Sequence, residues 1–202
     1  MATSTSAAAS ATTSGDIVDV LRQCGRATRV FVAGVRPNQW SAPTNCDMDV
    51  RSLTNHVVAG LSWAAEIASG KTVTEIGSRF EGDVLGNAPL AAYDEAVAGA
   101  VAAFGRPGVL SQICSLPYGD VPGAVFCSHK LLDVFIHGWD IARATGQATT
   151  LDPDLVTIVY AMFKPHAAML QASGVFAPPV AVAAESDPQT LLLAMLGRDN
   201  RS

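Results

Sequence analysis

Apolar residues recur every three or four positions along several stretches of this chain, and this period predicts helices that bury one face. The first stretch runs from Asp16 to Val35 and stops before Pro37, whose ring cannot continue a helix. Its apolar face comprises Ile17, Val20, Leu21, Cys24, Ala27, Phe31 and Val35. Because such a helix must pack its apolar face against another element, the sequence favours a mainly all-α bundle.

Start and stop residues frame three further long helices, which span Asp49–Ser69, Pro89–Phe104 and Ala124–Thr145. Aspartate is a favoured N-cap and proline is favoured in the first turn of a helix, which fits the starts at 49 and 89. Glycine follows each predicted end, at positions 70, 105 and 146, where it can close a helix. Four long helices are therefore predicted.

The segments that connect these helices differ in kind. Lys71–Ala88 combines glycines with scattered charge and shows no period, which is typical of a long surface loop. Val109–Gly123 carries turn residues on both sides of a short apolar run, which favours short strands or a small hairpin. The predicted bundle is thus interrupted by a short strand connector.

A further set of elements follows the fourth helix. Asp152, placed before a proline, starts a fifth helix that Pro165 should kink. Val175–Ala183 is expected to be extended, and Asp187 starts a last short helix. Since the chain shows no repeat and no linker, residues 15–202 are predicted to form a single helical-bundle domain.

The composition excludes several classes of protein. Hydrophobic residues make up 49% and charged residues 15% of the 202 positions, which excludes an intrinsically disordered chain. The formal net charge of −5 disfavours binding to nucleic acid or to an anionic membrane surface. No apolar run approaches the roughly 18 residues of a membrane span. We therefore expect no nucleic-acid and no membrane partner.

The N-terminus and the cysteines bear on where the protein resides. Residues Met1–Ser14 are mostly alanine, serine and threonine without the positive and leucine-rich regions of a secretory signal, so we expect a disordered tail. The cysteines show no C-x-x-C spacing and are expected to be reduced thiols in the cytoplasm; they are Cys24, Cys46, Cys114 and Cys127. Cys24 and Cys127 fall within helical patterns, which favours core positions for them.

Three titratable residues lie in apolar stripes, where they stand out because charge is scarce in this chain. His56 is in the middle of the second predicted helix, and Asp133 and His137 are four residues apart on the fourth. Residues four apart share a helix face, so both side chains can reach one small ion. Imidazole and carboxylate ligands suit a divalent metal, and a third ligand from a facing helix would leave positions open for water or substrate.

The spacing of these residues also fits a simpler reading. An aspartate and a histidine at this spacing can form a buried hydrogen-bonded pair without any metal. His129 could compete for Asp133, but it lies eight residues from His137, about 12 Å along a helix axis, so both imidazoles cannot bind one ion together. We expect His129 to be partly exposed and His166, which follows a proline, to be a packing or surface residue.

Other polar and aromatic residues give weaker signals. Asp140 could pair with Arg143 on the same helix, or accept a hydrogen bond from the free N–H of a metal-bound histidine. Trp63, Trp139 and Tyr93 could line a pocket, although core packing is the commoner role of such residues. The sequence shows no nucleophile elbow, zinc-protease motif or phosphate-binding loop, so the catalytic residues remain unknown.

Two segments resemble a known family. Asp49–His56 reads D-V-R-S-L-T-N-H, and His137–Gly146 reads H-G-W-D-I-A-R-A-T-G. Both are similar to motifs of actinobacterial proteins related to the N-terminal domain of mycothiol-dependent maleylpyruvate isomerase. The ending Leu193–Asp199 is also similar to the family's C-terminus, so the resemblance covers most of the chain. Met48 departs from the family pattern, which usually has an aromatic residue before this first motif.

The resemblance implies a DinB-like four-helix bundle with up-down-down-up topology. It also implies a metal triad whose positions fall here on His56, Asp133 and His137. The isomerase has glutamate at the middle position, so the shorter Asp133 is a departure that could move the metal or weaken its binding. Nitrogen and oxygen ligands do not select one metal sharply, so zinc is expected first, with nickel, iron or manganese as alternatives.

Two classes of function follow from these residues. The first is a metal-dependent enzyme that uses a low-molecular-weight thiol, mycothiol in the family it resembles, for S-transfer or isomerisation of a small electrophile. A metal-bound water would give a hydrolytic variant of it. The second is a non-catalytic metal-binding or regulatory module. Related bundles often form homodimers, and nothing in this sequence specifies the interface.

Overall fold

The computed structural model describes residues 14–200, and long helices form in it where the apolar period predicts them. They are α1 (Ser14–Ala33), α2 (Val50–Ala68), α4 (Pro89–Phe104) and α5 (Gly123–Ala144). Helix α1 ends at Ala33, two residues before the predicted end at Val35, and the side chain of Gln147 donates to the carbonyl of Phe31 in its last turn. Ser14, predicted to be in the tail, begins α1; the remainder of that predicted tail, residues 1–13, lies outside the described residues.

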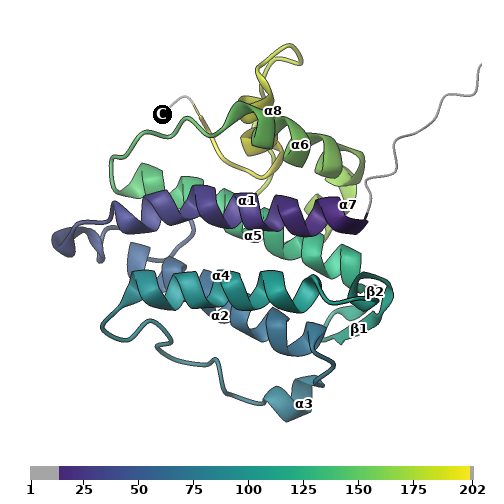
Figure 1. Cartoon of the computed structure of the whole chain (residues 1–202). Helices are drawn as coiled ribbons and strands as arrows, with labels where there is room; N and C mark the ends of the chain where they lie inside the picture. The colour runs from purple at the N-terminus through teal and green to yellow at the C-terminus, as the bar shows by residue number, and fades with distance from the viewer. Residues whose placement is uncertain (1–13, 201–202) are drawn as a thin grey trace, which may run out of the picture.

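Figure 1 shows the long helices in two layers, with α1 beside α5 and α2 beside α4. Helices α2 and α4 run in the same direction, and α1 and α5 run in the opposite one. This is the up-down-down-up arrangement, and the chain makes it by crossing the length of the bundle between α2 and α4. The mainly all-α fold is thereby confirmed.

The crossing segment is more ordered than its sequence suggested. A short helix, α3 (Val73–Ile76), interrupts the predicted surface loop. The Thr72 side chain accepts from the backbone N–H of Glu75, and the Glu75 carboxylate accepts from the backbone N–H of Thr72. This reciprocal capping satisfies donors that a helix start leaves free, so even one turn can persist.

The predicted hairpin is present before α5. Strands β1 (Ile113–Leu116) and β2 (Gly119–Pro122) pair in antiparallel register. Of the three-residue 3-10 turns, η1 (Pro37–Gln39) follows α1 and η2 (Val109–Ser111) precedes β1. The hairpin therefore closes one end of the bundle beside α5, as the ribbon in Figure 1 shows.

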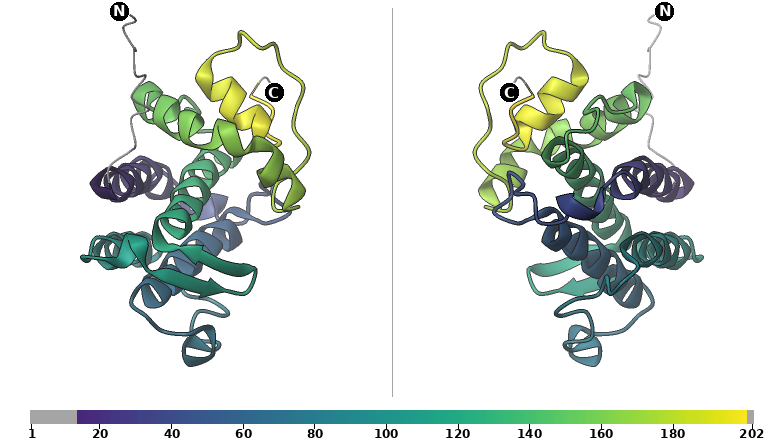
Figure 2. Two further views of the ribbon diagram at one scale, coloured as in Figure 1. Left: turned by 90° about the vertical axis from the view of Figure 1, so that its right-hand side faces the viewer. Right: turned by 90° about the vertical axis from the view of Figure 1, so that its left-hand side faces the viewer.

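The C-terminal elements form a third layer. They are α6 (Pro153–Phe163), the 3-10 turn η3 (Lys164–His166), α7 (Ala167–Ala172) and α8 (Pro188–Met195). The kink expected at Pro165 takes the form of η3, which separates α6 from α7. Figure 2 shows that α6 and α8 lie on the side of α1 and α5 that faces away from α2 and α4. Helix α5 is therefore covered on both sides.

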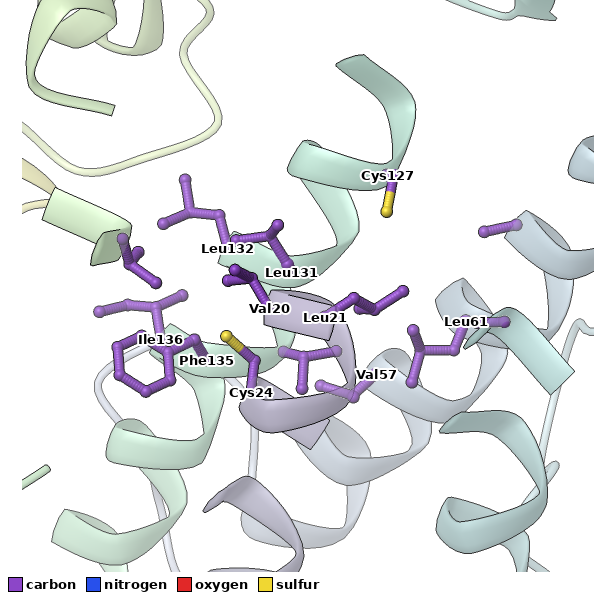
Figure 3. Packing of buried hydrophobic residues seen from close by; sticks show 14 of the residues in the cluster. Val20, Leu21, Cys24, Val57, Leu61, Cys127, Leu131, Leu132, Phe135 and Ile136 are labelled. Atoms are coloured by element: carbon purple, nitrogen blue, oxygen red, sulfur yellow. The ribbon is translucent and has the colours of Figure 1, made fainter. Parts of the chain in front are cut away.

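The core fills the space between these layers. Figure 3 shows Cys24 of α1 among Val20, Leu21 and Phe135, with Cys127 near the start of α5. Both thiols are 0% exposed, and burial raises the pKa of each, so they act as small apolar groups as predicted. Within residues 14–200 no helix has the length and apolar character that crossing a membrane requires.

Two helical glycines test how closely the layers pack. A Cβ added at Gly138 would lie 2.3 Å from Oγ1 of buried Thr28, whereas at Gly99 it would lie 4.0 Å from the Cβ of Ala65. We expect Gly138→Ala to lower the free energy of unfolding, because overpacking costs about 1–3 kcal/mol and outweighs the better helix propensity of alanine. Gly99→Ala should raise it, by up to about 1 kcal/mol. Urea unfolding measures both, and a stabilised Gly138→Ala would contradict this packing.

Candidate metal centre

The three predicted ligands meet where α2 packs against α5. His56 lies in the second turn of α2, whose start is fixed by Asp49, an N-cap that accepts from the backbone N–H of Ser52. Asp133 and His137 lie one turn apart on the facing side of α5. Residues far apart in the sequence thus supply one cluster.

The distances within this cluster suit a common ion. Asp133 Oδ1 lies 3.5 Å from His56 Nε2 and 3.3 Å from His137 Nε2. One ligand atom from each residue falls within 4.8 Å of the others. A tetrahedral ion with bonds of about 2.0–2.2 Å sets its ligand atoms about 3.4 Å apart, so these separations need little adjustment. The donor set of two imidazoles and one carboxylate also fits a divalent metal.

The cluster is open on one side and closed on the other. The side chain of His56 is 49% exposed, that of Asp133 is 23% exposed and that of His137 is 10% exposed. His56 therefore stands at the solvent edge of its helix rather than deep in the apolar stripe where the sequence placed it. The two imidazole rings meet edge to face, with centroids 5.4 Å apart. A ligand can approach from the His56 side, where coordination positions would be free.

The charges of Asp133 and His137 support each other. Burial alone would raise the pKa of Asp133, but hydrogen bonds from His137 and His56 hold it well below its usual value. Burial alone would lower the pKa of His137, but hydrogen bonds to Asp133 and Asp140 raise it well above its usual value. Asp133 is therefore a carboxylate over the whole neutral range and can serve as an anionic ligand.

Asp140 contacts the other nitrogen of His137. Its Oδ2 lies 2.9 Å from His137 Nδ1, and it also accepts from Arg198 Nη2 at 2.9 Å. The carboxylate is 0% exposed, and its pKa falls to about 2: burial opposes ionisation, and the bonds from His137 and Arg198 outweigh it. Of the two roles expected for Asp140, the contact with His137 is thus present. Arg143 lies over the ring of Trp139 instead, 5.3 Å from its centroid.

Cys46 also belongs to this buried network, although the sequence analysis assigned no role to it in the site. Its Sγ lies 3.2 Å from Asp140 Oδ2, 3.4 Å from Arg198 Nη2 and 4.0 Å from His137 Nδ1. Cys46, His137 and Asp140 therefore form a second group with metal-ligand chemistry. The guanidinium of Arg198 already supplies the positive charge between Asp140 and Cys46, so the first group is the better candidate for a metal.

Lys130 adds a positive charge at the rim of the first cluster. Its Nζ lies 3.9 Å from Asp133 Oδ2 and above the ring of Phe126. A Cβ added at Gly60 on α2 would lie 3.5 Å from this Nζ and 3.8 Å from Asp133 Oδ2. The missing side chain of Gly60 therefore leaves room for a small group beside both charges.

A hollow of about 290 Å³ continues from His56 along α2. Its walls include Gly60, Trp63 and Phe80, with Glu81 at the exposed edge. Trp63 meets Phe126 edge to face at 5.9 Å, which fixes the orientation of its ring. The hollow could take a small, partly apolar molecule next to the cluster.

The remaining candidates lie elsewhere. His129 is half-buried, and its Nδ1 lies 3.1 Å from the hydroxyl of Tyr118 on the hairpin. His166 is exposed in η3, as expected. Trp139 and Tyr93 are 1% exposed and pack in the core, so only Trp63 of the three aromatic candidates lines the hollow beside His56.

Arg198 is the main residue of this site that sequence reasoning missed. Its local signal is a charged residue directly after the apolar run that ends at Gly197. The partner of that charge, Asp140, is 58 residues earlier in the chain, and no local pattern encodes a contact of that range.

Comparison with known proteins finds one matching family and two similar mycobacterial proteins. A sequence profile described as the mycothiol maleylpyruvate isomerase N-terminal domain matches residues 21–142. Uncharacterized proteins from two strains of Mycobacterium tuberculosis are 37% identical to this chain over 126 residues. That similarity spans 62% of this chain and 65% of each relative, which is less than two thirds of their length. No solved structure matches significantly.

The depressed pKa of Asp140 predicts a pH effect on stability. The folded protein holds this carboxylate ionised, so its contribution is complete above the unfolded pKa near 4 and is lost as the pH falls towards about 2. The loss should be about 2 kcal/mol in the unfolding free energy. Asp140→Asn should flatten this acid limb in urea unfolding measured without metal, while exposed Asp120→Asn should leave it unchanged. An equally steep limb in Asp140→Asn would rule out this assignment.

Proposed function

This chain belongs to the mycothiol maleylpyruvate isomerase N-terminal domain family, and from that membership we propose that it is a metal- and thiol-dependent enzyme. The proposed metal ligands are His56, Asp133 and His137. The proposed reaction joins a low-molecular-weight thiol, mycothiol by the family's name, to a small electrophile, in S-transfer or isomerisation. No protein nucleophile is needed for it.

The observation that carries this proposal is the convergence of the three side chains. Two helices that are separate in the sequence bring one oxygen and two nitrogens within 4.8 Å, with one of the histidines facing solvent. A structural hydrogen-bonded pair would need only Asp133 and His137. The third residue, His56, has no place in such a pair, and its Nε2 comes to 3.5 Å from Asp133 Oδ1 from a different helix, which favours an ion.

The chain's own residues would divide the work around that ion. A bound divalent metal would favour the thiolate form of a coordinated thiol, which is the nucleophilic form. Trp63 and Phe80 offer apolar walls for the electrophile, in the hollow beside His56. The ammonium of Lys130 is placed to attract an anionic group in the space beside Gly60.

The identity of the metal follows only from the donor set. Two imidazoles and a carboxylate suit zinc, and nickel, iron or manganese can bind the same ligands. Three further expectations also remain predictions: a small-molecule substrate with its thiol, a homodimer, and a location in the cytoplasm. Two alternatives are a non-catalytic metal-binding module and a metal-dependent hydrolase, and the experiments below separate them.

The metal site itself is tested by substitution of its ligands. We expect the tag-free protein to bind one zinc per chain, and His56→Ala and His137→Ala each to weaken binding by more than about 100-fold, since losing even a supporting partner costs about 10–100-fold. His129→Ala and His166→Ala are matched controls that should keep wild-type affinity. Competition with a chromophoric chelator gives the affinities. Equal zinc affinities for all four variants would show that these histidines do not form the metal site.

The thiol chemistry needs a separate assay. Zinc-loaded protein should accelerate consumption of mycothiol by one or more members of a panel of small electrophiles, and His137→Ala should not. His166 lies away from the cluster, so the His166→Ala variant should consume mycothiol at the wild-type rate. Product formation that requires mycothiol without consuming it would indicate isomerisation, whereas metal-dependent product formation in the absence of mycothiol would instead support a hydrolase. A metal-loaded protein that changes neither thiol nor electrophile would support the non-catalytic module.

A further inference from the structure

Arg198 reaches the metal centre from the C-terminal layer. It follows α8 and the turn at Gly197, whose positive φ of 78° suits glycine. A Cβ at that glycine would lie 2.6 Å from the carbonyl oxygen of Ala177, so the turn has no room for a side chain. The backbone N–H of Arg198 donates to Leu193 at 2.8 Å. The chain is thus fixed where the arginine leaves it.

The guanidinium is held in one orientation by several acceptors. Nη2 and Nε of Arg198 donate to the two oxygens of Asp140, at 2.9 Å and 3.3 Å. Nη1 donates to the carbonyl of Leu196 at 2.6 Å, and Cys46 Sγ lies 3.4 Å from Nη2. Arg198 is 7% exposed and Asp140 is 0% exposed, so water does not replace these bonds. A buried two-point contact of this kind fixes a carboxylate in plane and in rotation.

Asp140 transfers that constraint to His137. The oxygen that accepts from Arg198 Nη2 also lies 2.9 Å from His137 Nδ1. Since a carboxylate only accepts, Nδ1 must donate to Asp140, and Nε2, which faces Asp133 and His56, is the nitrogen that would give up its proton to a metal there. That is the ring orientation and tautomer a metal ligand requires.

We propose that Arg198 is a positioning residue of the metal centre, which acts through Asp140 to fix the ring of His137. This inference rests on the proposed metal-binding function. It makes residues beyond the family match at 21–142 part of the site. The C-terminal segment is then needed for more than covering α5.

The test compares zinc affinity in full-length variants. We expect Arg198→Met to weaken zinc binding by about 10–100-fold and Arg198→Lys to weaken it less, because lysine keeps the charge but not the two-point contact. Asp140→Asn should weaken binding to a similar degree. The double variant should be no weaker than the worse single variant, since both remove the same link.

A structural control separates positioning from general loosening of the C-terminal layer. Gln189 donates to the carbonyl of Thr149 and accepts from the backbone N–H of Leu151, so it fastens α8 without contacting Asp140. Gln189→Ala should lower the urea midpoint and leave zinc affinity unchanged.

Nitrogen-15 NMR of His137 gives a second measurement, which does not depend on the stability of the fold. Nδ1 should carry the proton in the wild type, and Arg198→Lys should shift the Nδ1 signal.

The outcomes are distinct. Wild-type zinc affinity in both Arg198→Met and Arg198→Lys overturns this inference alone and leaves the proposed function standing. A wild-type protein that binds no divalent metal overturns the proposed function and this inference with it. If Arg198→Met does not fold, the decision rests on Arg198→Lys, and an unshifted Nδ1 signal with unchanged affinity overturns the inference.

Discussion

The carboxylate of Asp140 has no contact with water, so its charge must be balanced inside the protein. Its partners come from three separate parts of the chain: His137 on its own helix, Cys46 in the loop before α2, and Arg198 after α8. Removing one partner of such a buried pair typically costs about 3–5 kcal/mol. The position of the C-terminal layer is therefore tied to the middle of the bundle by charge as well as by apolar contact.

The same network separates the two nitrogens of His137. One nitrogen faces the buried side, where Asp140 holds it, and the other faces the open side, where Asp133 and His56 lie. Burial decreases steadily from Asp140 through His137 to His56. A rigid interior thus supports a solvent-accessible edge, which is the arrangement a reactive metal site needs if its ligands are to stay in place while substrates exchange.

Much of the fold was predictable because its signals are local. Asp49, Pro89 and the glycines after the helices mark the ends of regular apolar patterns, and the observed ends differ from the predicted ones by two residues at most. Helix α3 was missed, although Thr72 and Glu75 are spaced as a capping box requires. A single turn offers no period to recognise, which explains the omission.

The candidate site was predictable only in part. The spacing of Asp133 and His137 follows from helix geometry, and a facing histidine could be proposed once two helices were expected to pack. The exposure of His56 and the contact between Cys46 and Asp140 depend on loop paths and on how the layers settle. Those features arise from long-range packing that one sequence does not encode in a readable form.

The family match ends at Ala142, two residues after Asp140, while the cation that Asp140 depends on lies more than fifty residues later. A fragment that ends at residue 142 would keep all three proposed ligands. It would lack Arg198, so the carboxylate of Asp140 would either stay buried without that cation or become exposed to solvent. In this protein, the segment that defines the family and the segment that carries the proposed positioning residue therefore have different boundaries.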